Sequence, residues 1–454
     1  MNPYIFRKYD IRGVVETDFN SDVVTSLGRA FGTYIIREDC QRVSISGDVR
    51  KTTPRLKKDF LQGLVETGIT VLDMGIAPTP SNYFSMFHLD VDGAVQITGS
   101  HNPPEFNGFK LSYNQSAFYG DQIQDLRKLM EEGDFETGVG NVEKIDIMTP
   151  YQNMLKEKIS IDRPLKAVID CGNAAACLSA PDIFSKVGIK TLELYSDVDG
   201  TFPNHHPDPT DDHNLVELVK QVQSGNYDFG VAFDGDADRV VAVDEMGGII
   251  RSDILMAIFL REIIQNPGDP IVFDVKCSQA LEDTIIQYGG KPVMWKTGHS
   301  LIKDKMKELN ASFAGEMSGH IFFADDYYGY DDAIYVSLRL AQLLSKTNIR
   351  LSKLTAEIPI YYSTPEMRLQ CRNDEEKFQI SQKADEYFTL NYDCLTIDGV
   401  RINFKDGWGL VRASNTQPVI VCRFEAKSFE RMKEIQNEIL GKLFEFGEIS
   451  IEHR

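Results

Sequence analysis

A serine in a tight loop is the residue of this sequence best placed for chemistry. Ser100 lies in segment 98–104, whose glycine, asparagine and prolines are poorly tolerated in helices and central strands. The loop directly follows the apolar run 94–97, and Lys110 comes ten residues after the serine. Two prolines after the serine exclude the hydrolase elbow, which needs G-x-S-x-G opening a helix. We therefore expect a reactive or modified serine at the exit of a strand.

Three carboxylates at alternate positions form a second candidate site. Asp234, Asp236 and Asp238 follow the apolar segment 229–233, and Arg239 comes next. The small residues between them let the loop wrap round one point, where three acidic side chains repel one another unless a cation separates them. Oxygen ligands favour Mg²⁺ or a similar ion, which usually keeps room for a phosphate oxygen.

Other interpretations of the acidic segment compete. An EF-hand would use Asp234, Asp236, Asp238 and Glu245, but Arg239 replaces the glycine that its turn needs, and the flanks are strand-like. A haloacid-dehalogenase-type phosphatase would use Asp234 as its nucleophile, but the usual D-x-D-G-T continuation is absent. The plainest alternative is a solvated acidic turn.

A third candidate is segment 315–320, in which two glycines flank Glu316, Ser318 and His320. Carboxylate, hydroxyl and imidazole groups read sugar hydroxyls, each of which needs a donor and an acceptor. His320 can also move a proton. The alternative is a structural turn.

The fourth candidate is an arginine followed by small polar residues, which suits a phosphate. Its members are Arg412, Ser414, Asn415 and Thr416. The alternative is turn formation and helix capping by the small residues. Weaker single candidates are Tyr9, Arg12, Lys276 and His299.

Short strands that alternate with helices must position these residues. Segments 42–48, 54–67 and 70–75 read as strand, helix and strand, which predicts α/β architecture. The same pattern restarts near residues 165 and 270. Further on, 395–402 and 419–424 predict antiparallel strands, and 428–446 predicts a helix, so the last hundred residues form a smaller α+β domain.

Composition limits the class of protein. A chain of 454 residues is too long to form a single hydrophobic core, so we expect three or four domains. The net charge of −20 argues against nucleic acid as a partner. No apolar run is long enough for a membrane helix, and the N-terminus lacks a signal-peptide core. Seven scattered cysteines fit a reducing compartment. We expect a cytoplasmic protein that is a monomer or a small homo-oligomer, with no membrane or nucleic-acid partner.

Together, in this order and spacing, the motifs resemble the α-D-phosphohexomutase superfamily, most closely its bacterial phosphomannomutase/phosphoglucomutase branch. The resemblance runs from segment 6–13 to Pro418. It implies an α/β fold of four domains round a central cleft, three related mixed α/β domains and a C-terminal TBP-like α+β domain. The expected boundaries are 1–149, 150–249, 250–357 and 358–454. Ala237 stands where the family commonly has glycine, and its methyl group should fit if the backbone there is not left-handed.

The resemblance also implies a reaction. Ser100 would carry a phosphate and complete a Mg²⁺ site with Asp234, Asp236 and Asp238. A hexose 1- or 6-phosphate of mannose or glucose would pass through a hexose 1,6-bisphosphate, which is both intermediate and activator. The implied catalytic residues are Ser100, Lys110, His320, Arg12 and Arg239. The implied substrate-binding residues are Tyr9, Lys276, His299, Glu316, Ser318, Arg412, Ser414, Asn415 and Thr416.

Two rival functions remain at this stage. A sugar-phosphate phosphatase would release inorganic phosphate and need no bisphosphate. A non-catalytic sugar-phosphate-binding protein would need no reactive serine.

Overall fold

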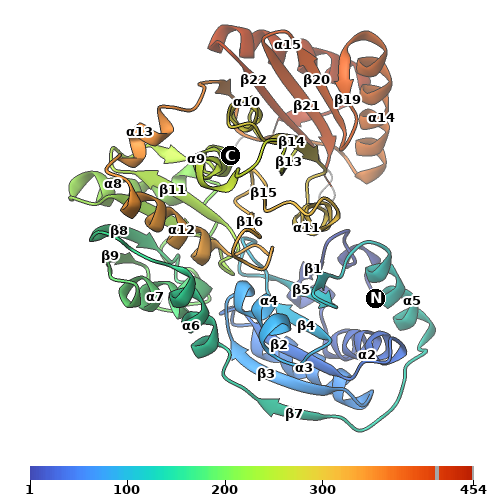
Figure 1. Cartoon of the computed structure of the whole chain (residues 1–454). Helices are drawn as coiled ribbons and strands as arrows, with labels where there is room; N and C mark the ends of the chain where they lie inside the picture. Colours follow the sequence, from blue (N-terminus) through green and yellow to red (C-terminus); the bar gives the residue numbers. More distant parts are fainter. Residues whose placement is uncertain (415–418, 452–454) are drawn as a thin grey trace. The chain divides into compact units, whose positions relative to one another are not determined.

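The computed structural model describes residues 1–414 and 419–451, and the chain divides into two compact units. Unit 1 comprises residues 1–255 and 318–355, and unit 2 comprises residues 256–317 and 356–454 (Figure 1). Helix α9 (Ser252–Ile263) passes from one unit to the other. Within the described residues, no helix combines the length and the apolar character that crossing a membrane requires.

The first sheet of unit 1 is mixed and runs β1-β5-β4-β2-β3-β7, with β6 beside β5. Strands β4, β2, β3 and β7 are parallel, whereas β5 is antiparallel to both of its neighbours in that order. The strands are β1 (Ile11–Val14), β2 (Arg42–Gly47), β3 (Thr70–Ile76), β4 (Gly93–Ile97), β5 (Phe106–Tyr113), β6 (Ser116–Ala117) and β7 (Asn141–Lys144). The helices are α1 (Val15–Asp18), α2 (Ser21–Arg37), α3 (Thr53–Glu66), α4 (Thr79–His88) and α5 (Asp121–Glu132), after a 3-10 turn at Pro3–Ile5.

This sheet presents the serine loop at one edge. Because β2 and β4 are parallel neighbours, both end on the same side, and Asp48 and Thr98 follow their ends. The aromatic core behind them includes Phe60 stacked on Phe109, with ring centroids 5.1 Å apart. The edge that carries segment 98–104 therefore rests on a packed core.

The second sheet of unit 1 has the order β12-β11-β10-β8-β9, and β10, β8 and β9 are parallel. Its strands are β8 (Leu165–Asp170), β9 (Ile189–Leu194), β10 (Phe229–Phe233), β11 (Val240–Asp244) and β12 (Ile249–Ile250). The helices are α6 (Met148–Lys158), α7 (Ala180–Lys186), α8 (Val216–Ser224), α12 (Ala333–Lys346) and α13 (Leu351–Thr355), with 3-10 turns at Ala175–Leu178 and Asp212–Leu215. Strand β16 (Ile321–Phe323) also belongs to unit 1, and Asp234 directly follows β10.

Unit 2 begins with three parallel strands, β13 (Pro270–Asp274), β14 (Lys291–Trp295) and β15 (Phe313–Gly315). They are connected by α10 (Gln279–Gln287) and α11 (His299–Glu308). Parallel strands end at the same edge of a sheet. Lys276, His299 and Glu316 each follow one of these strand ends, so the topology brings the three together.

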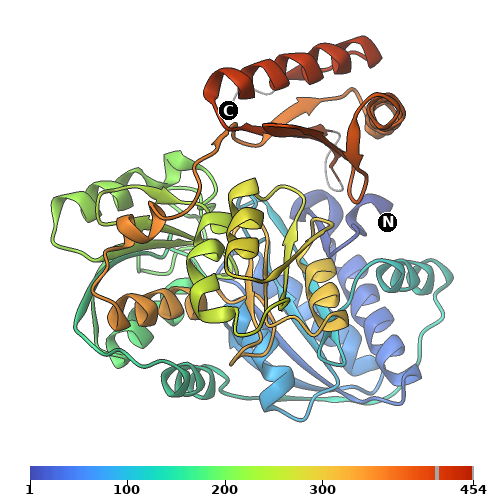
Figure 2. The same cartoon turned by 45° about the horizontal axis from the view of Figure 1, so that its top comes forward.

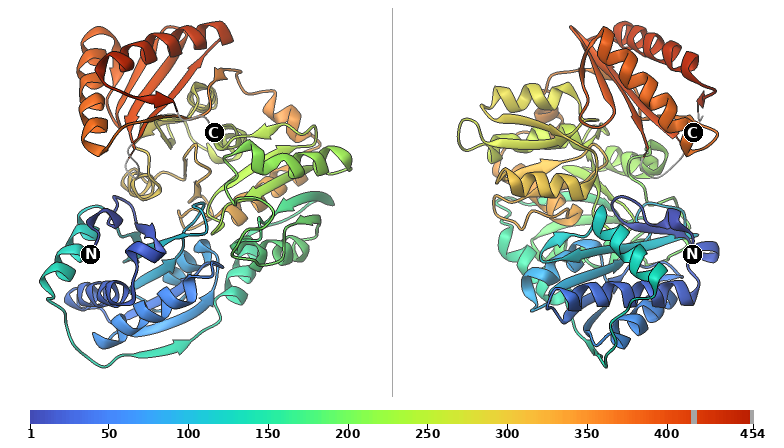
Figure 3. Two further views of the ribbon diagram at one scale, coloured as in Figure 1. Left: turned by 180° about the vertical axis from the view of Figure 1, so that it is seen from behind. Right: turned by 90° about the vertical axis from the view of Figure 1, so that its right-hand side faces the viewer.

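The rest of unit 2 is an antiparallel sheet ordered β19-β20-β21-β22-β18-β23, with β17 beside β22. Its strands are β17 (Tyr362–Ser363), β18 (Met367–Gln370), β19 (Asp393–Leu395), β20 (Val400–Phe404), β21 (Gly407–Ala413), β22 (Val419–Ala426) and β23 (Ser450–Ile451). Helices α14 (Asp374–Asn391) and α15 (Phe429–Phe446) share one hydrophobic core with this sheet, and Figures 2 and 3 show both on the same face.

The structure confirms most of the predicted elements and corrects one. Segments 42–48, 54–67, 70–75, 165–170, 419–424 and 428–446 form the predicted strands and helices within a few residues. The predicted strand 395–402 is wrong, because β19 ends at Leu395 and β20 starts at Val400. Between them, Gly399 has φ +73°, and an added Cβ would lie 2.3 Å from the carbonyl oxygen of Val411. The turn frees Asp398 for the contacts described below.

Candidate active site

Ser100 is buried at the end of β4 and faces the acidic loop of the second sheet. Its Oγ donates to Oδ2 of Asp234 at 2.8 Å and lies 3.2 Å from Nδ1 of His101. Its backbone N–H donates to Oγ1 of Thr98 at 2.8 Å, and its φ is +49°. A left-handed backbone at a non-glycine residue is strained and typical of functional loops. The predicted position of the serine after the end of a strand is confirmed, although its side chain is buried and not exposed. That Ser100 is reactive or modified stays a prediction.

A buried arginine holds the serine loop in this conformation. Arg50 is 1% exposed, and its Nη2 donates to the carbonyl oxygens of Ser100 and Asn102, both at 2.6 Å. Its Nη1 donates to those of Pro103 at 2.7 Å and Phe106 at 3.2 Å. One guanidinium thus satisfies three carbonyl groups of the serine loop and that of Phe106, the first residue of β5, which fixes the path of the backbone between β4 and β5.

Asp48 completes this support. Its carboxylate accepts from Nε of Arg50 at 3.1 Å, from the hydroxyl of Thr98 at 2.9 Å and from the backbone N–H of Gly99 at 3.1 Å. The buried charge of Arg50 is therefore paired, as burial of a charge requires. Asp48 and Arg50 join the ends of β2 and β4 and position Ser100 from behind.

Asp234, Asp236 and Asp238 are all fully buried, and one carboxylate oxygen from each lies within 4.8 Å of the other two. Among the described residues, Oδ1 of Asp236 and Oδ1 of Asp238 have no hydrogen-bond donor. Buried carboxylate oxygens are normally satisfied, so two oxygens without a donor in an all-oxygen cluster fit a hard divalent cation. The triad can hold a metal ion next to the serine.

Electrostatics support this assignment. Burial raises the pKa of Asp234, and the charges of Asp236 and Asp238 raise it further. Burial also acts to raise the pKa of Asp236, but the Lys110 ammonium outweighs it and lowers the pKa. Three carboxylates buried this close together repel one another, and a bound cation would relieve that repulsion.

Lys110, on β5, is the ammonium group of this cluster. Its Nζ donates to Oδ2 of Asp236 at 2.7 Å and also to Asp238. Burial alone would lower the pKa of Lys110, but the charges of Asp236 and Asp238 outweigh it and raise the pKa. Lys110 is therefore a permanent cation, and it is a better source of positive charge than a proton acceptor.

His320 is joined to the acidic loop through Arg239. Nε of Arg239 donates to Nε2 of His320 at 3.0 Å, so the ring proton is on Nδ1. Nδ1 lies 2.9 Å from Oδ2 of Asp331 and 3.7 Å from Oδ1 of Asp238. The structure thus gives His320 a defined orientation, with an accepting Nε2 and a carboxylate behind its protonated nitrogen.

The backbone of the acidic loop is held from several sides. Thr79 donates its N–H to the carbonyl oxygen of Asp236 at 2.9 Å and its hydroxyl to Oδ2 of Asp236 at 2.5 Å. A Cβ at Gly235 would lie 2.2 Å from the carbonyl oxygen of Ser100, so only glycine allows the two loops to approach this closely.

The backbone at Ala237 is left-handed, which is the conformation in which its methyl group was not expected to fit easily. Its φ is +63°, which is left-handed, and its side chain is fully buried. Its carbonyl oxygen accepts from the N–H of Ala333 at 3.2 Å, and its N–H donates to the carbonyl oxygen of Asp234 at 3.2 Å. These contacts hold an alanine in a conformation that glycine adopts more easily.

The remaining sequence-predicted residues of unit 1 lie at its N-terminus and at Ser318. Arg12, on β1, pairs with Asp10 at 2.5 Å. Burial lowers the pKa of His101, and the charges of Arg239 and Arg12 lower it further, so Arg12 acts electrostatically on the serine loop. Tyr9 is half-buried, with the Lys8 ammonium 5.8 Å from its ring centroid, and Ser318 is half-buried.

Unit 2 carries a second cluster, centred on Lys276. Its Nζ lies 3.3 Å from Oε2 of Glu366 and 3.9 Å from Oδ2 of Asp274. Burial alone would lower the pKa of Lys276, but the charges of Glu366 and Asp274 raise it. The lysine is therefore a buried ammonium group held between carboxylates.

Two arginines of the C-terminal sheet hold the Lys276 loop. Nη1 of Arg401 donates to the carbonyl oxygens of Val275 at 2.8 Å and Cys277 at 3.2 Å, and Arg423 donates to that of Lys276. The guanidinium of Arg401 lies 3.8 Å from the ring centroid of Trp408. Three successive carbonyl groups are thus fixed by buried arginine side chains.

The other predicted residues of unit 2 are joined through carboxylates. Oε1 of Glu316 accepts from the N–H of Gly298 at 2.5 Å, next to His299 at the start of α11. Oδ2 of Asp398 accepts from Nε of Arg412 at 2.9 Å and from the N–H of Thr297 at 3.1 Å. The structure therefore links Glu316 and, through Asp398, Arg412 to the loop that leads into His299.

Ser414 ends the described part of the predicted phosphate loop. Its N–H donates to the carbonyl oxygen of Val419 at 2.9 Å, and its own carbonyl oxygen accepts from Nζ of Lys377 at 2.8 Å. Asn415 and Thr416 lie outside the described residues.

Sequence reasoning missed several residues that support both clusters. In unit 1 these are Asp48, Arg50, Thr79 and Asp331, and in unit 2 they are Glu366, Asp398, Arg401 and Arg423. Most of them act on backbone groups or on other side chains, so no spacing rule marks them. Only Asp48 and Arg50 could have been predicted from the sequence. They directly follow a predicted strand of an α/β sheet, and functional residues are common at the ends of such strands.

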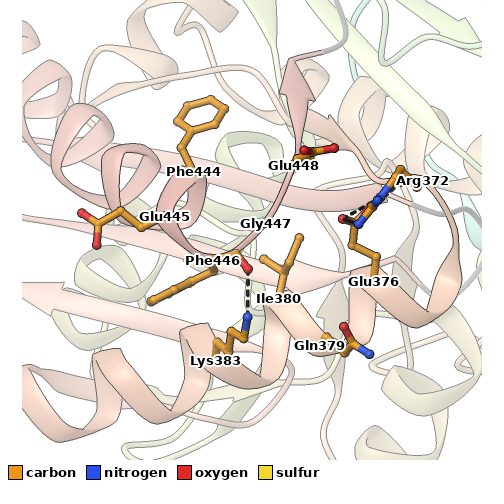
Figure 4. Close-up of a pocket in the computed structure, with 10 residues that line it drawn as sticks. All are labelled: Arg372, Glu376, Gln379, Ile380, Lys383, Phe444, Glu445, Phe446, Gly447 and Glu448. Carbon is orange, nitrogen blue, oxygen red and sulfur yellow. Dashed lines mark hydrogen bonds and ion pairs between the residues drawn. The ribbon is translucent and has the colours of Figure 1, made fainter.

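A hollow of about 390 Å³ between α14 and α15 is a separate feature (Figure 4). Arg372 pairs there with Glu376 at 2.7 Å, and Lys383 donates to the carbonyl oxygen of Phe446 at 3.0 Å. None of the candidate catalytic or binding residues lines it.

Comparison with known proteins identifies the family. Sequence models of phosphoglucomutase/phosphomannomutase match residues 3–137 (alpha/beta/alpha domain I), 149–247 (domain II), 251–362 (domain III) and 349–442 (C-terminal domain). The chain belongs to the phosphoglucomutase/phosphomannomutase family. The predicted superfamily and the predicted four-domain α/β fold are thereby confirmed.

Individual relatives span the whole chain. A phosphomannomutase/phosphoglucomutase of Pseudomonas aeruginosa is 43% identical over 97% of this chain and 95% of its own length. A phosphoglucomutase of Neisseria meningitidis is 39% identical over 96% of this chain and 95% of its own. The crystal structure of a phosphoglucomutase/phosphomannomutase family protein from Burkholderia thailandensis superposes with a TM-score of 0.92 at 39% identity, covering 99% of each chain.

Proposed function

We propose that this chain is a hexose phosphate mutase that interconverts the 1- and 6-phosphates of glucose and mannose through phosphorylated Ser100. Its family and the names of its relatives support the activity. The observation that carries the proposal is the 2.8 Å hydrogen bond from Oγ of Ser100 to Asp234. Asp234 belongs to the buried triad of aspartates, and Lys110 is paired with another member of that triad, Asp236. A serine beside a metal-type site suits carriage of a phosphate.

Each residue of the unit 1 cluster has a role in this proposal. Asp234, Asp236 and Asp238 would hold Mg²⁺ together with an oxygen of phosphoserine. The ion would polarise the phosphoryl group and balance its charge. Lys110 and Arg239 add fixed positive charge, and Arg12 adds more near His101.

Proton transfer is better assigned to His320 than to Lys110, because the ammonium is paired with two carboxylates whereas Nε2 of the imidazole is an acceptor. A substrate hydroxyl that replaces Arg239 as donor to Nε2 would give its proton to the ring. Its oxygen then bonds to phosphorus as the bond from phosphorus to Oγ breaks. Oγ of Ser100 leaves with the electron pair of that bond and takes up the proton that the His320 ring received. The product of this half is a hexose 1,6-bisphosphate, and the second half returns the other phosphate to Ser100.

The unit 2 cluster has side chains that suit a sugar phosphate. Lys276, Arg412 and Ser414, with Asn415 and Thr416, suit the phosphate that is not being transferred. Glu316 and His299 suit the sugar hydroxyls, and Ser318 and Tyr9, which belong to unit 1, are further candidates. Glucose and mannose differ at C2, so recognition through O3 and O4 would accept both sugars.

The proposal extends to the setting of the enzyme. We place it in the cytoplasm as a monomer or small homo-oligomer without a nucleic-acid partner, with domain boundaries near residues 149, 249 and 358. The net charge of −20 supports the exclusion of nucleic acid. All seven cysteines lie within the described residues and none forms a disulfide, which fits a reducing compartment.

Replacement of Ser100 by alanine tests the function. Removing the phosphate carrier should lower kcat at least about 10³-fold in a coupled mannose 1-phosphate assay, with an unchanged melting temperature. Intact-mass analysis should show a wild-type fraction heavier by one phosphate and no such fraction in the variant. Near-normal turnover by Ser100→Ala would overturn the mechanism. Release of inorganic phosphate without isomerisation would indicate a phosphatase, and binding without turnover by the wild type would indicate a non-catalytic protein.

A further inference from the structure

The cations of the unit 2 cluster are already paired with carboxylates. Lys276 lies near Asp274 and Glu366, Arg412 is paired with Asp398, and Nε of Arg368 lies 3.5 Å from Oε1 of Glu366. A phosphate that binds these cations must therefore compete with carboxylates for them. The effect of that competition depends on which carboxylates are fixed in place.

Three carboxylates of the cluster also hold backbone or side-chain groups of the loop before α11. Asp274 accepts from the hydroxyl of Thr297 at 3.0 Å, and Asp398 accepts from the N–H of Thr297 at 3.1 Å. Glu316 accepts from the N–H of Gly298 at 2.5 Å. Moving any of these three carboxylates would leave a loop donor unsatisfied.

Glu366 differs from these three. Among the described residues, its carboxylate contacts only two cations, Lys276 and Arg368. It precedes β18 and belongs to no helix or strand, and its side chain keeps 28% of its surface exposed. Glu366 can therefore leave the cations without breaking a hydrogen bond to the backbone.

The charge of Glu366 is strongly coupled to the cations of this cluster. Burial alone would raise the pKa of Glu366, but the charges of Lys276 and Arg368 outweigh it and lower the pKa to about 2. Arg412 lowers it further. The carboxylate is therefore fully ionised at neutral pH, and its charge is close to each cation that a phosphate would use.

We infer that Glu366 is a displaceable counter-anion of the phosphate-binding cluster, which yields Lys276 and Arg368 to the substrate phosphate and keeps its affinity low enough for release. The inference rests on the proposed function, because it concerns the binding of the phosphate that is not transferred. A bisphosphate that must turn round between two transfers needs a phosphate site that releases as readily as it binds. A carboxylate that returns to the lysine as the phosphate leaves supplies that property.

Glu366→Gln separates this role from a purely positioning one. The substitution keeps the size and hydrogen-bonding reach of the side chain and removes the negative charge. A counter-anion predicts tighter binding, because a phosphate dianion no longer meets a like charge. A residue that merely holds Lys276 in place predicts weaker binding, because the lysine loses its ionic partner.

The equilibrium test uses glucose 6-phosphate as the probe and isothermal titration calorimetry on Ser100→Ala and Ser100→Ala/Glu366→Gln proteins. We expect the dissociation constant to fall about tenfold in the double variant, as for loss of one like charge near a buried site. The kinetic test uses Glu366→Gln alone, in which the KM for glucose 1-phosphate and the inhibition constant of inorganic phosphate should fall by a similar factor while kcat also falls.

Two further variants complete the design. Glu366→Asp keeps the charge and should leave the dissociation constant within about threefold of the reference. Glu445→Gln removes the same charge from an exposed pair with Lys442 in α15 and should change neither constant. A dissociation constant that is unchanged or raised by Glu366→Gln would overturn the inference while leaving mutase activity in place. A wild-type protein without mutase activity would overturn the proposed function itself.

Discussion

The aspartate cluster of unit 1 and the Lys276 cluster of unit 2 are supported in the same way, but the first suits a cation and the second suits an anion. In unit 1, three buried aspartates converge on one point, and two of their oxygens have no donor among the described residues. In unit 2, carboxylates lie directly against lysine and arginine side chains. The first arrangement is suited to gaining a cation, and the second is suited to exchanging one anion for another. The comparison shows how a strongly acidic chain can bind an anionic substrate.

The shared support is buried arginine on backbone carbonyl groups. Arg50 donates to three carbonyls of the serine loop and to that of Phe106 in unit 1. Arg401 and Arg423 donate to three successive carbonyls round Lys276 in unit 2. The planar guanidinium with five donors can fix several carbonyls at once, which a lysine cannot do. Ser100 and Lys276 are thus both held through backbone carbonyl groups of their loops, while their side chains contact carboxylates.

The comparison predicts that the first cluster determines turnover and that the second determines affinity. Asp236→Asn removes a carboxylate of the proposed metal site while keeping the shape of the side chain. It should lower kcat about 10³-fold in a coupled glucose 1-phosphate assay, and Mg²⁺ should no longer raise the melting temperature.

Asp182→Asn, on an exposed ion pair with Lys186 in α7, is the matched control and should behave as the wild type does. If Asp236→Asn turned over within about threefold of the wild-type rate, the prediction that the first cluster holds a metal ion required for turnover would be wrong.

Arg412→Ala tests the second cluster. Loss of charge-assisted hydrogen bonds to the phosphate should raise the KM for both hexose phosphates about 10–100-fold, with kcat changed by less than about threefold. Arg372→Ala in the hollow of Figure 4 removes an equal charge from the same unit and should leave both constants unchanged. A fall in kcat at constant KM would show that the division between turnover and affinity is wrong.

The smallest effect concerns backbone strain, which differs between the clusters. Ser100 and Ala237 in unit 1 have positive φ, whereas the described candidate residues of unit 2 have none. Ala237→Gly relieves strain of about 1–2 kcal/mol but adds unfolded-state entropy, so the free energy of unfolding should rise by about 0.5–1 kcal/mol.

Urea unfolding would measure this change, with Ala242→Gly in β11 as the control at an ordinary strand position, where glycine should destabilise the fold. A loss of stability in Ala237→Gly comparable to that of the control would mean that the left-handed backbone is not strained by the methyl group.

The sequence predicted the elements better than the contacts between them. Strand ends after apolar runs are local features, so the placement of Ser100 and Asp234 at such ends follows from pattern alone. The role of Arg50 does not, because its partners are carbonyl groups that every residue has, and an arginine in a loop is normally solvated. Asp398 lies in an Asp-Gly pair that reads as a simple turn, yet it links Arg412 to the loop before His299.

Some predictions came from the family resemblance and not from local physics. The pairing of Ser100 with Asp234 spans 134 residues of sequence, and no periodicity predicts such a contact. Local reasoning also failed at Ala237, because the sign of φ depends on the contacts that hold the loop and not on the residue type. Position-specific strain of this kind becomes visible only in three dimensions.

The ring that stacks on Arg401 also gives this enzyme an optical property. Its two tryptophans, Trp295 and Trp408, both belong to unit 2, so intrinsic tryptophan fluorescence arises from that unit alone. Trp408 packs beneath the guanidinium that fixes the Lys276 loop and donates its indole N–H to Glu425 at 2.9 Å. Emission from Trp408 therefore reports on the surroundings of the Lys276 loop, whereas unit 1, which carries Ser100, contributes no tryptophan signal.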